Sequence, residues 1–159
     1  VIGKLLGACF IGWSLLMILG GGLAILFIAR GIPPSLYYYS HMGGEMLRVL
    51  ILAALLTCLS TGLGYMQTTF IGGVICLMGL ASYMLPIYAT LIGPSVASGL
   101  FWLIYWLVPS WNHFGFGLEI CFATGSVFVY CLLLVAYSLA YAAFFAILAV
   151  LGFQWRDIT

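Results

Sequence analysis

Only a few side chains in this sequence could do acid–base or charge-pair chemistry. Glu45 and Arg48 lie three residues apart, so on a helix they share one face and can form an ion pair. Glu119 follows a glycine-containing stretch and has no charged neighbour in the sequence. Ionisable groups within a membrane are functional candidates, but all three residues are expected near the ends of membrane segments, where a solvated position at the interface explains them. We therefore treat them as candidate polar sites, with the interfacial explanation favoured.

Two histidines, His41 and His113, could bind haem, chlorophyll or a metal, because imidazole is a common ligand. Both fall in predicted loops, and neither has a second histidine one or two helical turns away. We therefore expect no bound cofactor and no metal site. A pigment or haem on either histidine remains the alternative.

The chain contains no residues on which an enzyme mechanism could be built. It has no P-loop motif, no H-E-x-x-H motif, and no Ser, His and Asp set that can be placed together. The five cysteines are odd in number and form no C-x-x-C pair, so neither a disulfide framework nor a zinc site is indicated. We expect that the chain is not an enzyme and that it does not itself hydrolyse ATP.

The composition defines the surroundings in which these residues must work. A chain that is 66% hydrophobic and 4% charged cannot cover a globule with polar surface, so its partner is the lipid bilayer. The four basic residues are scattered and the net charge is +1, which argues against a nucleic-acid partner. The sequence therefore predicts an all-α, polytopic transmembrane helical bundle in a cell membrane.

Long uncharged intervals leave room for about four full crossings, because a helix needs roughly 20 apolar residues to span the hydrocarbon. We expect one transmembrane domain over residues 1–159, with crossings at about 5–29, 44–63, 70–92 and 128–153. The apolar stretch at about 95–108 is too short to cross and is expected to be a re-entrant or interfacial helix. Four crossings place both termini on one side of the membrane.

Local signals predict how these crossings begin, bend and end. The stretch 31–39 contains Pro33 and Pro34 followed by three tyrosines, which indicates a surface loop at the membrane interface. Glu45 is then expected in the first turn of the second crossing, where a carboxylate complements the helix dipole. A tight turn is expected between residues 62 and 69, and Pro86 is expected to kink the outer end of the third crossing.

Small residues at four-residue spacing allow helices to approach closely in lipid. The glycines expected to pack against another helix are Gly3, Gly7, Gly20, Gly21 and Gly22. Similar patterns occur at residues 53–62 and 138–146, and Tyr130, Tyr137 and Tyr141 share one face of the last crossing, as expected for packing or a polar seam between helices. Whether the small residues form a subunit interface or pack within the chain stays open.

Two short motifs, Leu-Val-Pro-Ser-Trp-Asn-His-Phe at residues 107–114 and Tyr-Ser-Leu-Ala-Tyr at 137–141, resemble the permease subunits of type-two ABC transporters. The stretch 107–114, Leu-Val-Pro-Ser-Trp-Asn-His-Phe, resembles the Leu-Pro-Asn segment after the fifth helix of that family. Tyr-Ser-Leu-Ala-Tyr at 137–141 and Phe-Gln-Trp-Arg-Asp-Ile at 153–158 resemble its last helix, although Gln154 and Trp155 replace the usual basic residues. Gly-Lys at residues 3–4 and Leu-Ser-Thr at 59–61 resemble the start of its third helix and the end of its fourth.

The resemblance implies that the chain corresponds to the last four helices of such a permease, a fragment lacking the N-terminal helices. It also implies cytoplasmic termini in a bacterial cytoplasmic membrane, a short re-entrant element outside, a second permease copy, and an ATP-binding subunit docked near residues 64–69. The substrate would move by alternating access. The alternative from another class is a structural or cofactor-holding subunit of a respiratory or photosynthetic complex.

Overall fold

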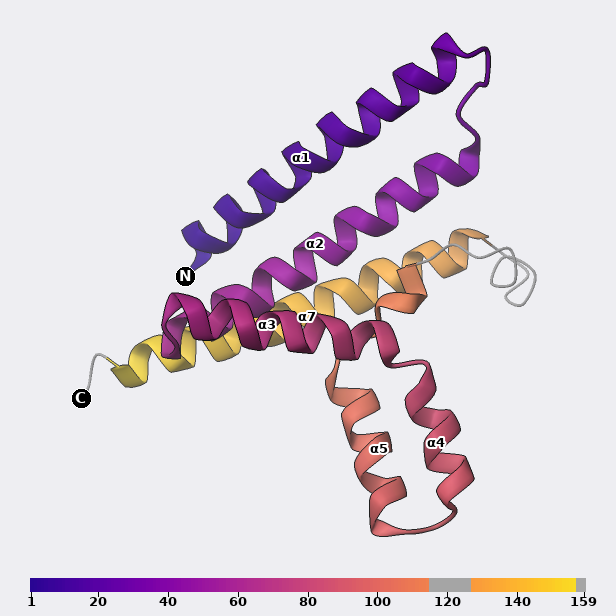
Figure 1. The fold of residues 1–159 in the computed structure, drawn as a ribbon. Coiled ribbons are helices and arrows are strands. Elements are labelled where there is room, and N and C mark those ends of the chain that lie inside the picture. The colour runs from indigo at the N-terminus through magenta and orange to yellow at the C-terminus, as the bar shows by residue number, and fades with distance from the viewer. Residues whose placement is uncertain (115–126, 157–159) are drawn as a thin grey trace.

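The computed structural model describes residues 1–114 and 127–156, and all regular structure in these two ranges is helical (Figure 1). The predicted all-α fold is therefore confirmed. The elements are α1 (Ile2–Ala29), α2 (Leu36–Gly62), α3 (Tyr65–Ala81), α4 (Met84–Ile92), α5 (Val96–Leu107), the 3-10 helix η1 (Trp111–Phe114) and α7 (Val127–Arg156).

Three of these helices are long and apolar enough to cross a membrane, namely α1, α2 and α7. The pair α3 and α4 adds a fourth crossing if the two bent helices are counted as one. At about 1.5 Å per residue, the 27 residues of α2 extend about 40 Å, which exceeds the roughly 30 Å of hydrocarbon in a bilayer. The described chain is thus a multi-pass membrane protein.

The second crossing begins eight residues earlier than expected, at Leu36 and not at residue 44. Ser35 follows the two prolines and caps the helix, because its hydroxyl accepts the backbone N–H of Tyr38 at 3.4 Å. The interfacial loop predicted over residues 31–39 is therefore wrong in its second half. As a result, Glu45 lies beyond the first turn of α2, contrary to the prediction.

The third crossing is two helices and not one, with a bend of 69° between α3 and α4. Pro86 was expected to kink a continuous helix, but the break lies just before it, at Ser82 and Tyr83. Pro86 has no N–H to donate to the carbonyl of residue 82, and its ring would clash with that carbonyl in a continuous helix. Pro86 is instead accommodated in the first turn of α4, where an N–H needs no helical partner.

The short helices α4 and α5 form a hairpin that points away from the other helices (Figure 1). Gly93 turns the chain with a φ of 74°, a conformation that side chains with a Cβ rarely adopt. Ser95 caps α5 by accepting the N–H of Ser98, whose hydroxyl in turn donates to the carbonyl of Ala89 at 2.9 Å. The helix α5 lies within the range expected for a short apolar helix.

Helix α1 packs on α2 through two glycines (Figure 1). A Cβ on Gly12 would meet Val49, and a Cβ on Gly20 would meet the side chain of Met42. The hydroxyl of Tyr38 also donates to the carbonyl of Gly20. Of the five glycines predicted to pack, Gly20 alone approaches another helix among the described residues. A Cβ added at the other four would meet none of these residues within 4 Å; they are Gly3, Gly7, Gly21 and Gly22.

Helix α2 also packs along α7, where small residues face each other. Ala54 and Ser138 are fully buried and Ala142 is 7% exposed, so the small residues of these two helices pack within the chain. At one end of the bundle, residues Val1 and Lys4 share a small cavity with Phe153 and the end of α2. The start of α1 and the end of α7 therefore lie at the same end, as Figure 1 shows.

The contact at Gly20 leads to a first prediction. Replacing Gly20 by Leu should lower the free energy of unfolding by about 1–3 kcal/mol, because the added side chain overpacks the contact with α2. Replacing the adjacent Gly21 by Leu should change it by no more than about 0.5 kcal/mol, because nothing lies within 4 Å of that position. Denaturant titration of the protein in lipid–detergent micelles measures both; equal effects would contradict the packing.

Candidate functional site

A short irregular segment after α5, residues 109–114, lies in the middle of the bundle and is here called the 109–114 segment. Pro109 follows the end of α5 and stops the helix, and η1 then forms a single turn. Its large side chains are buried: Trp111 is 3% exposed and Phe114 fully buried. Both belong to the hydrophobic core, together with Ile51 of α2 and Leu134 of α7.

Hydrogen bonds connect the 109–114 segment to α3. The indole Nε1 of Trp111 donates to the carbonyl of Cys76 at 2.9 Å, and Asn112 Nδ2 donates to the carbonyl of Leu80 at 3.1 Å. At the bend after α3, the hydroxyl of Ser82 is 2.7 Å from that of Ser110. The segment therefore holds the end of α3 at the point where the chain turns into the hairpin.

Tyrosine hydroxyls of α7 complete the contacts from the other side. The backbone N–H of Ser110 donates to the hydroxyl of Tyr137 at 2.9 Å, and the hydroxyl of Tyr141 donates to the carbonyl of Trp106 at 2.9 Å. The rings of Phe114 and Tyr137 lie 6.0 Å apart. The predicted polar seam along this face of α7 is confirmed for these two tyrosines.

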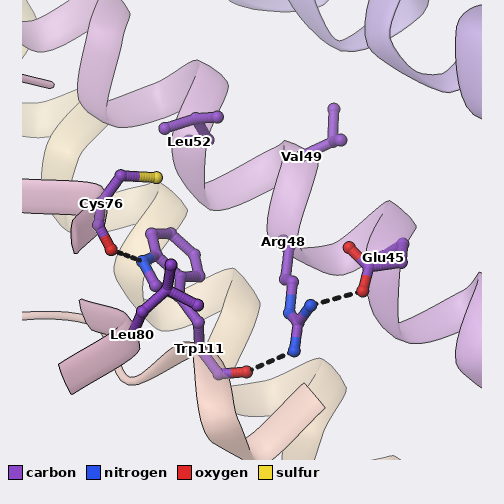
Figure 2. A pocket seen from close by; sticks show the side chains of 7 residues that line it. All are labelled: Glu45, Arg48, Val49, Leu52, Cys76, Leu80 and Trp111. Carbon is purple, nitrogen blue, oxygen red and sulfur yellow. Dashed lines mark hydrogen bonds and ion pairs between the residues drawn. The ribbon is translucent and has the colours of Figure 1, made fainter. Parts of the chain in front are cut away.

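Arg48 joins the 109–114 segment to α2, as Figure 2 shows. Its Nη1 donates to Glu45 Oε1, and its Nη2 donates to the carbonyl of Trp111 at 2.6 Å. The guanidinium carbon lies 5.8 Å from the centre of the Phe114 ring, within the range of a cation–π contact. The ion pair predicted from the three-residue spacing is present. Arg48 also bonds to the carbonyl of Trp111, a contact that the spacing could not reveal.

Glu45 and Arg48 lie deeper along α2 than the expected position near a helix end. Glu45 lies nine residues and Arg48 twelve residues after Leu36, so at about 1.5 Å per residue they sit about 14 and 18 Å along α2. Their side chains are only 27% and 24% exposed. The pair is therefore partly buried in the bundle and remote from either helix end, and the prediction of a helix-end pair is wrong.

The ion pair borders a cavity of about 240 Å³ between α2 and α3, open on one side (Figure 2). Its other walls are apolar and include Leu52, Leu80 and the indole of Trp111. The indole can lie here because Gly79 has no side chain: a Cβ at that position would meet the ring and come within 2.6 Å of the carbonyl of Pro109. The cavity thus combines one charged pair with a hydrocarbon-like lining.

The remaining candidates are placed as follows. His41 lies in α2 and not in a loop, with its Nε2 3.7 Å from Glu45 Oε1. His113 lies in η1, but its side chain and the whole of Glu119 fall outside the part of the chain that the structure describes. Within that part, no group of three His, Cys, Asp or Glu residues could hold a metal.

Sequence reasoning missed the two residues that organise this site. Trp111 is buried and bonds to α2 through its carbonyl and to α3 through its indole. Cys76 supplies the carbonyl that receives the indole N–H. The proline before Ser110 marked a helix end, but no local pattern shows which helices an irregular segment will contact.

The ion pair and the cavity together can hold and orient a polar group in apolar surroundings. The 109–114 segment is bonded to α2, α3 and α7, so a shift of this segment would act on all three helices. It offers no nucleophile with a base beside it, within the described residues. Comparison of the chain with protein-family models, with curated proteins and with solved structures finds no match. The function must therefore be argued from the geometry.

The ion pair leads to a second prediction. Replacing either Glu45 or Arg48 by Gln should lower the free energy of unfolding by about 1–3 kcal/mol, because each change leaves a partly buried group unpaired. The double variant should be more stable than the sum of the single effects predicts, by about 1 kcal/mol or more. Denaturant titrations of the four proteins measure this coupling; additive effects would show that the pair is energetically unimportant.

Proposed function

We propose that the chain is the membrane-embedded permease subunit of an ABC-type transporter in a cell membrane. A separate ATP-binding subunit would drive it, and the substrate, whose identity is open, would move by alternating access. The chain itself would contribute helices and a pathway, while ATP hydrolysis would take place in the partner.

The observation that carries this proposal is the order of the elements. The two long helices α1 and α2 are followed by α3, which bends into α4. Helices α4 and α5 then form the short hairpin, and the long helix α7 comes last. The resemblance of residues 107–114 and 137–141 to type-two permeases implies the same order, with a short re-entrant element before the last helix. The α4–α5 hairpin occupies that place.

The arrangement of the ends gives further support. The start of α1, the end of α2 and the end of α7 meet around one small cavity, so the turn between α2 and α3 lies at the same end as the first residues of α1 and the last residues of α7. For a permease, this would be the cytoplasmic end on which the ATP-binding subunit docks. The hairpin would then lie toward the other side of the membrane.

The candidate site suggests how movement could pass between helices. The 109–114 segment bonds to α2 through Arg48, to α3 through Trp111, and to α7 through Ser110. A tilt of α3 relative to α2 would therefore act on Trp111 and on the hairpin together. Packed elements that are tied in this way move as discrete bodies, which alternating access requires.

A third prediction tests the partner. We expect a photoreactive amino acid at Tyr65, which is 85% exposed next to the α2–α3 turn, to cross-link to a chain that carries a P-loop in native membranes. The same group at Ile32, which is 57% exposed at the opposite end of the bundle, should give no such adduct. Mass spectrometry of the adducts identifies the partner.

The cross-linking result also distinguishes a permease from the alternative class of protein, a cofactor-holding subunit of a respiratory or photosynthetic complex. Adducts at Tyr65 that lack any P-loop chain, together with a visible absorption band that disappears when His41 is replaced, would favour a cofactor-holding subunit. A P-loop adduct from both positions would contradict the placement of the ATP-binding subunit at the terminal end.

A fourth prediction concerns a second permease copy. No described residue would lie within 4 Å of a Cβ added at Gly3 or Gly7, so both positions are available to a helix of another subunit. Replacing both by Leu should reduce the fraction of assembled protein several-fold, because close helix approach is lost, whereas Ala8→Leu, exposed on a different face of α1, should not. Mass measurement of the purified assembly checks this; unchanged assembly and transport would rule out that interface.

A further inference from the structure

The ion pair beside the cavity has bonding capacity that the protein does not use. Both His41 and Arg48 approach the same oxygen of Glu45, Oε1, and the other carboxylate oxygen has no partner among the described residues. Arg48 donates two hydrogen bonds, while its Nε is buried without a partner. A guanidinium has five N–H groups, so further donors remain for a ligand.

The shape and lining of the cavity limit what could use this capacity. Val49, Leu52 and Leu80 form apolar walls. The N–H of the Trp111 indole is bonded to the carbonyl of Cys76, so the indole adds its ring to the lining of the cavity. A volume of about 240 Å³ is below the roughly 300–1,000 Å³ of pockets that enclose a drug-sized ligand. The cavity can therefore take one end of a molecule, while the rest remains outside among lipid or other helices.

The charges of the pair limit the ligand further. Glu45 and Arg48 together have no net charge, so the attraction of an ionic head group to one member of the pair is opposed by repulsion from the other. Such a head group would leave water for a largely apolar cavity without gaining a net opposite charge, which is costly. An uncharged group with both a donor and an acceptor can bond to the free carboxylate oxygen and to a free N–H of Arg48 without this penalty.

We propose that the cavity between α2 and α3 binds the polar end of an uncharged amphiphile that carries hydroxyl or amide groups, with its apolar part against Leu52, Leu80 and Trp111. Glu45 accepts from this group and Arg48 donates to it. The binding depends on the cavity alone and not on the chain being a transporter, so it can be tested without a partner subunit or transport.

A second groove in the same protein provides an internal comparison. It lies between α2 and α7, has a volume of about 330 Å³, and is lined by residues such as Leu47, Cys131 and Val135, with no charged side chain. Although larger, this groove offers no ion pair to select among head groups. An amphiphile that binds through apolar contact alone should therefore occupy it at least as well as the smaller cavity.

The experiment uses three photoreactive octyl amphiphiles that differ only in the head group: a glucoside, a trimethylammonium and a sulfonate. The protein is reconstituted in nanodiscs at pH 8. Peptide mapping then locates the adducts. We expect the glucoside to label residues 45–52 and 76–80 about fivefold more than either charged probe, because only the charged probes lose hydration that the neutral pair does not replace.

Charge variants provide the decisive comparison. Glu45→Gln should shift the preference at these residues to the sulfonate, and Arg48→Gln should shift it to the trimethylammonium probe, while labelling in the α2–α7 groove stays unchanged. The double variant, which leaves no charge, should be labelled less by the glucoside, because the charge-assisted hydrogen bonds are lost, and should favour neither charged probe; it covers the case in which a single variant does not fold. Equal labelling by all three probes in the unmodified protein, or preferences that the variants do not alter, would overturn the proposal.

Discussion

A stretch of non-helical backbone lies inside this helical bundle, and protein groups must make its hydrogen bonds. Water is absent from the hydrocarbon region of a bilayer, so irregular backbone is tolerated there only where other parts of the protein satisfy it. In the 109–114 segment, Arg48 binds the carbonyl of Trp111, and the hydroxyl of Tyr137 accepts the N–H of Ser110. The positions of α2 and α7 beside this segment follow from that requirement.

The same requirement accounts for the most unusual residue of the chain. An arginine partway along a membrane helix is costly unless its charge is paired and its N–H groups are bonded. Here Glu45 supplies the opposite charge and the 109–114 segment supplies a carbonyl, so two groups that are each unfavourable in lipid satisfy each other. Gly79 allows this by leaving room for the indole that fixes the segment against α3.

Much of the fold could be predicted from the sequence, because composition and charge spacing alone decide that the chain is helical and lies in a membrane. The errors came from short-range effects that change where a helix starts. Ser35 caps α2 directly after two prolines, and Pro86 ends one helix and begins another. Because the start of α2 moved, the predicted depth of Glu45 was wrong even though its pairing with Arg48 was right.

The site was harder to predict, because its central contacts join residues far apart in the sequence. The bond from Arg48 to Trp111 spans 63 residues and that from Trp111 to Cys76 spans 35. No periodicity encodes such pairs. The spacing of Tyr137 and Tyr141 did indicate a seam, because both lie on one face of a single helix, and their rings are 4.7 Å apart.

The hairpin of α4 and α5 also gives the molecule a different width at different depths. Helix α3 is about 25 Å long, and at its end the chain turns by 69° and runs sideways before it returns. The long helices add similar cross-section at every level, whereas the hairpin adds cross-section at one level only. If the long helices run across the bilayer, such a shape takes more area in one leaflet than in the other. We then expect the free energy of the protein to depend on the curvature and lateral tension of the membrane around it.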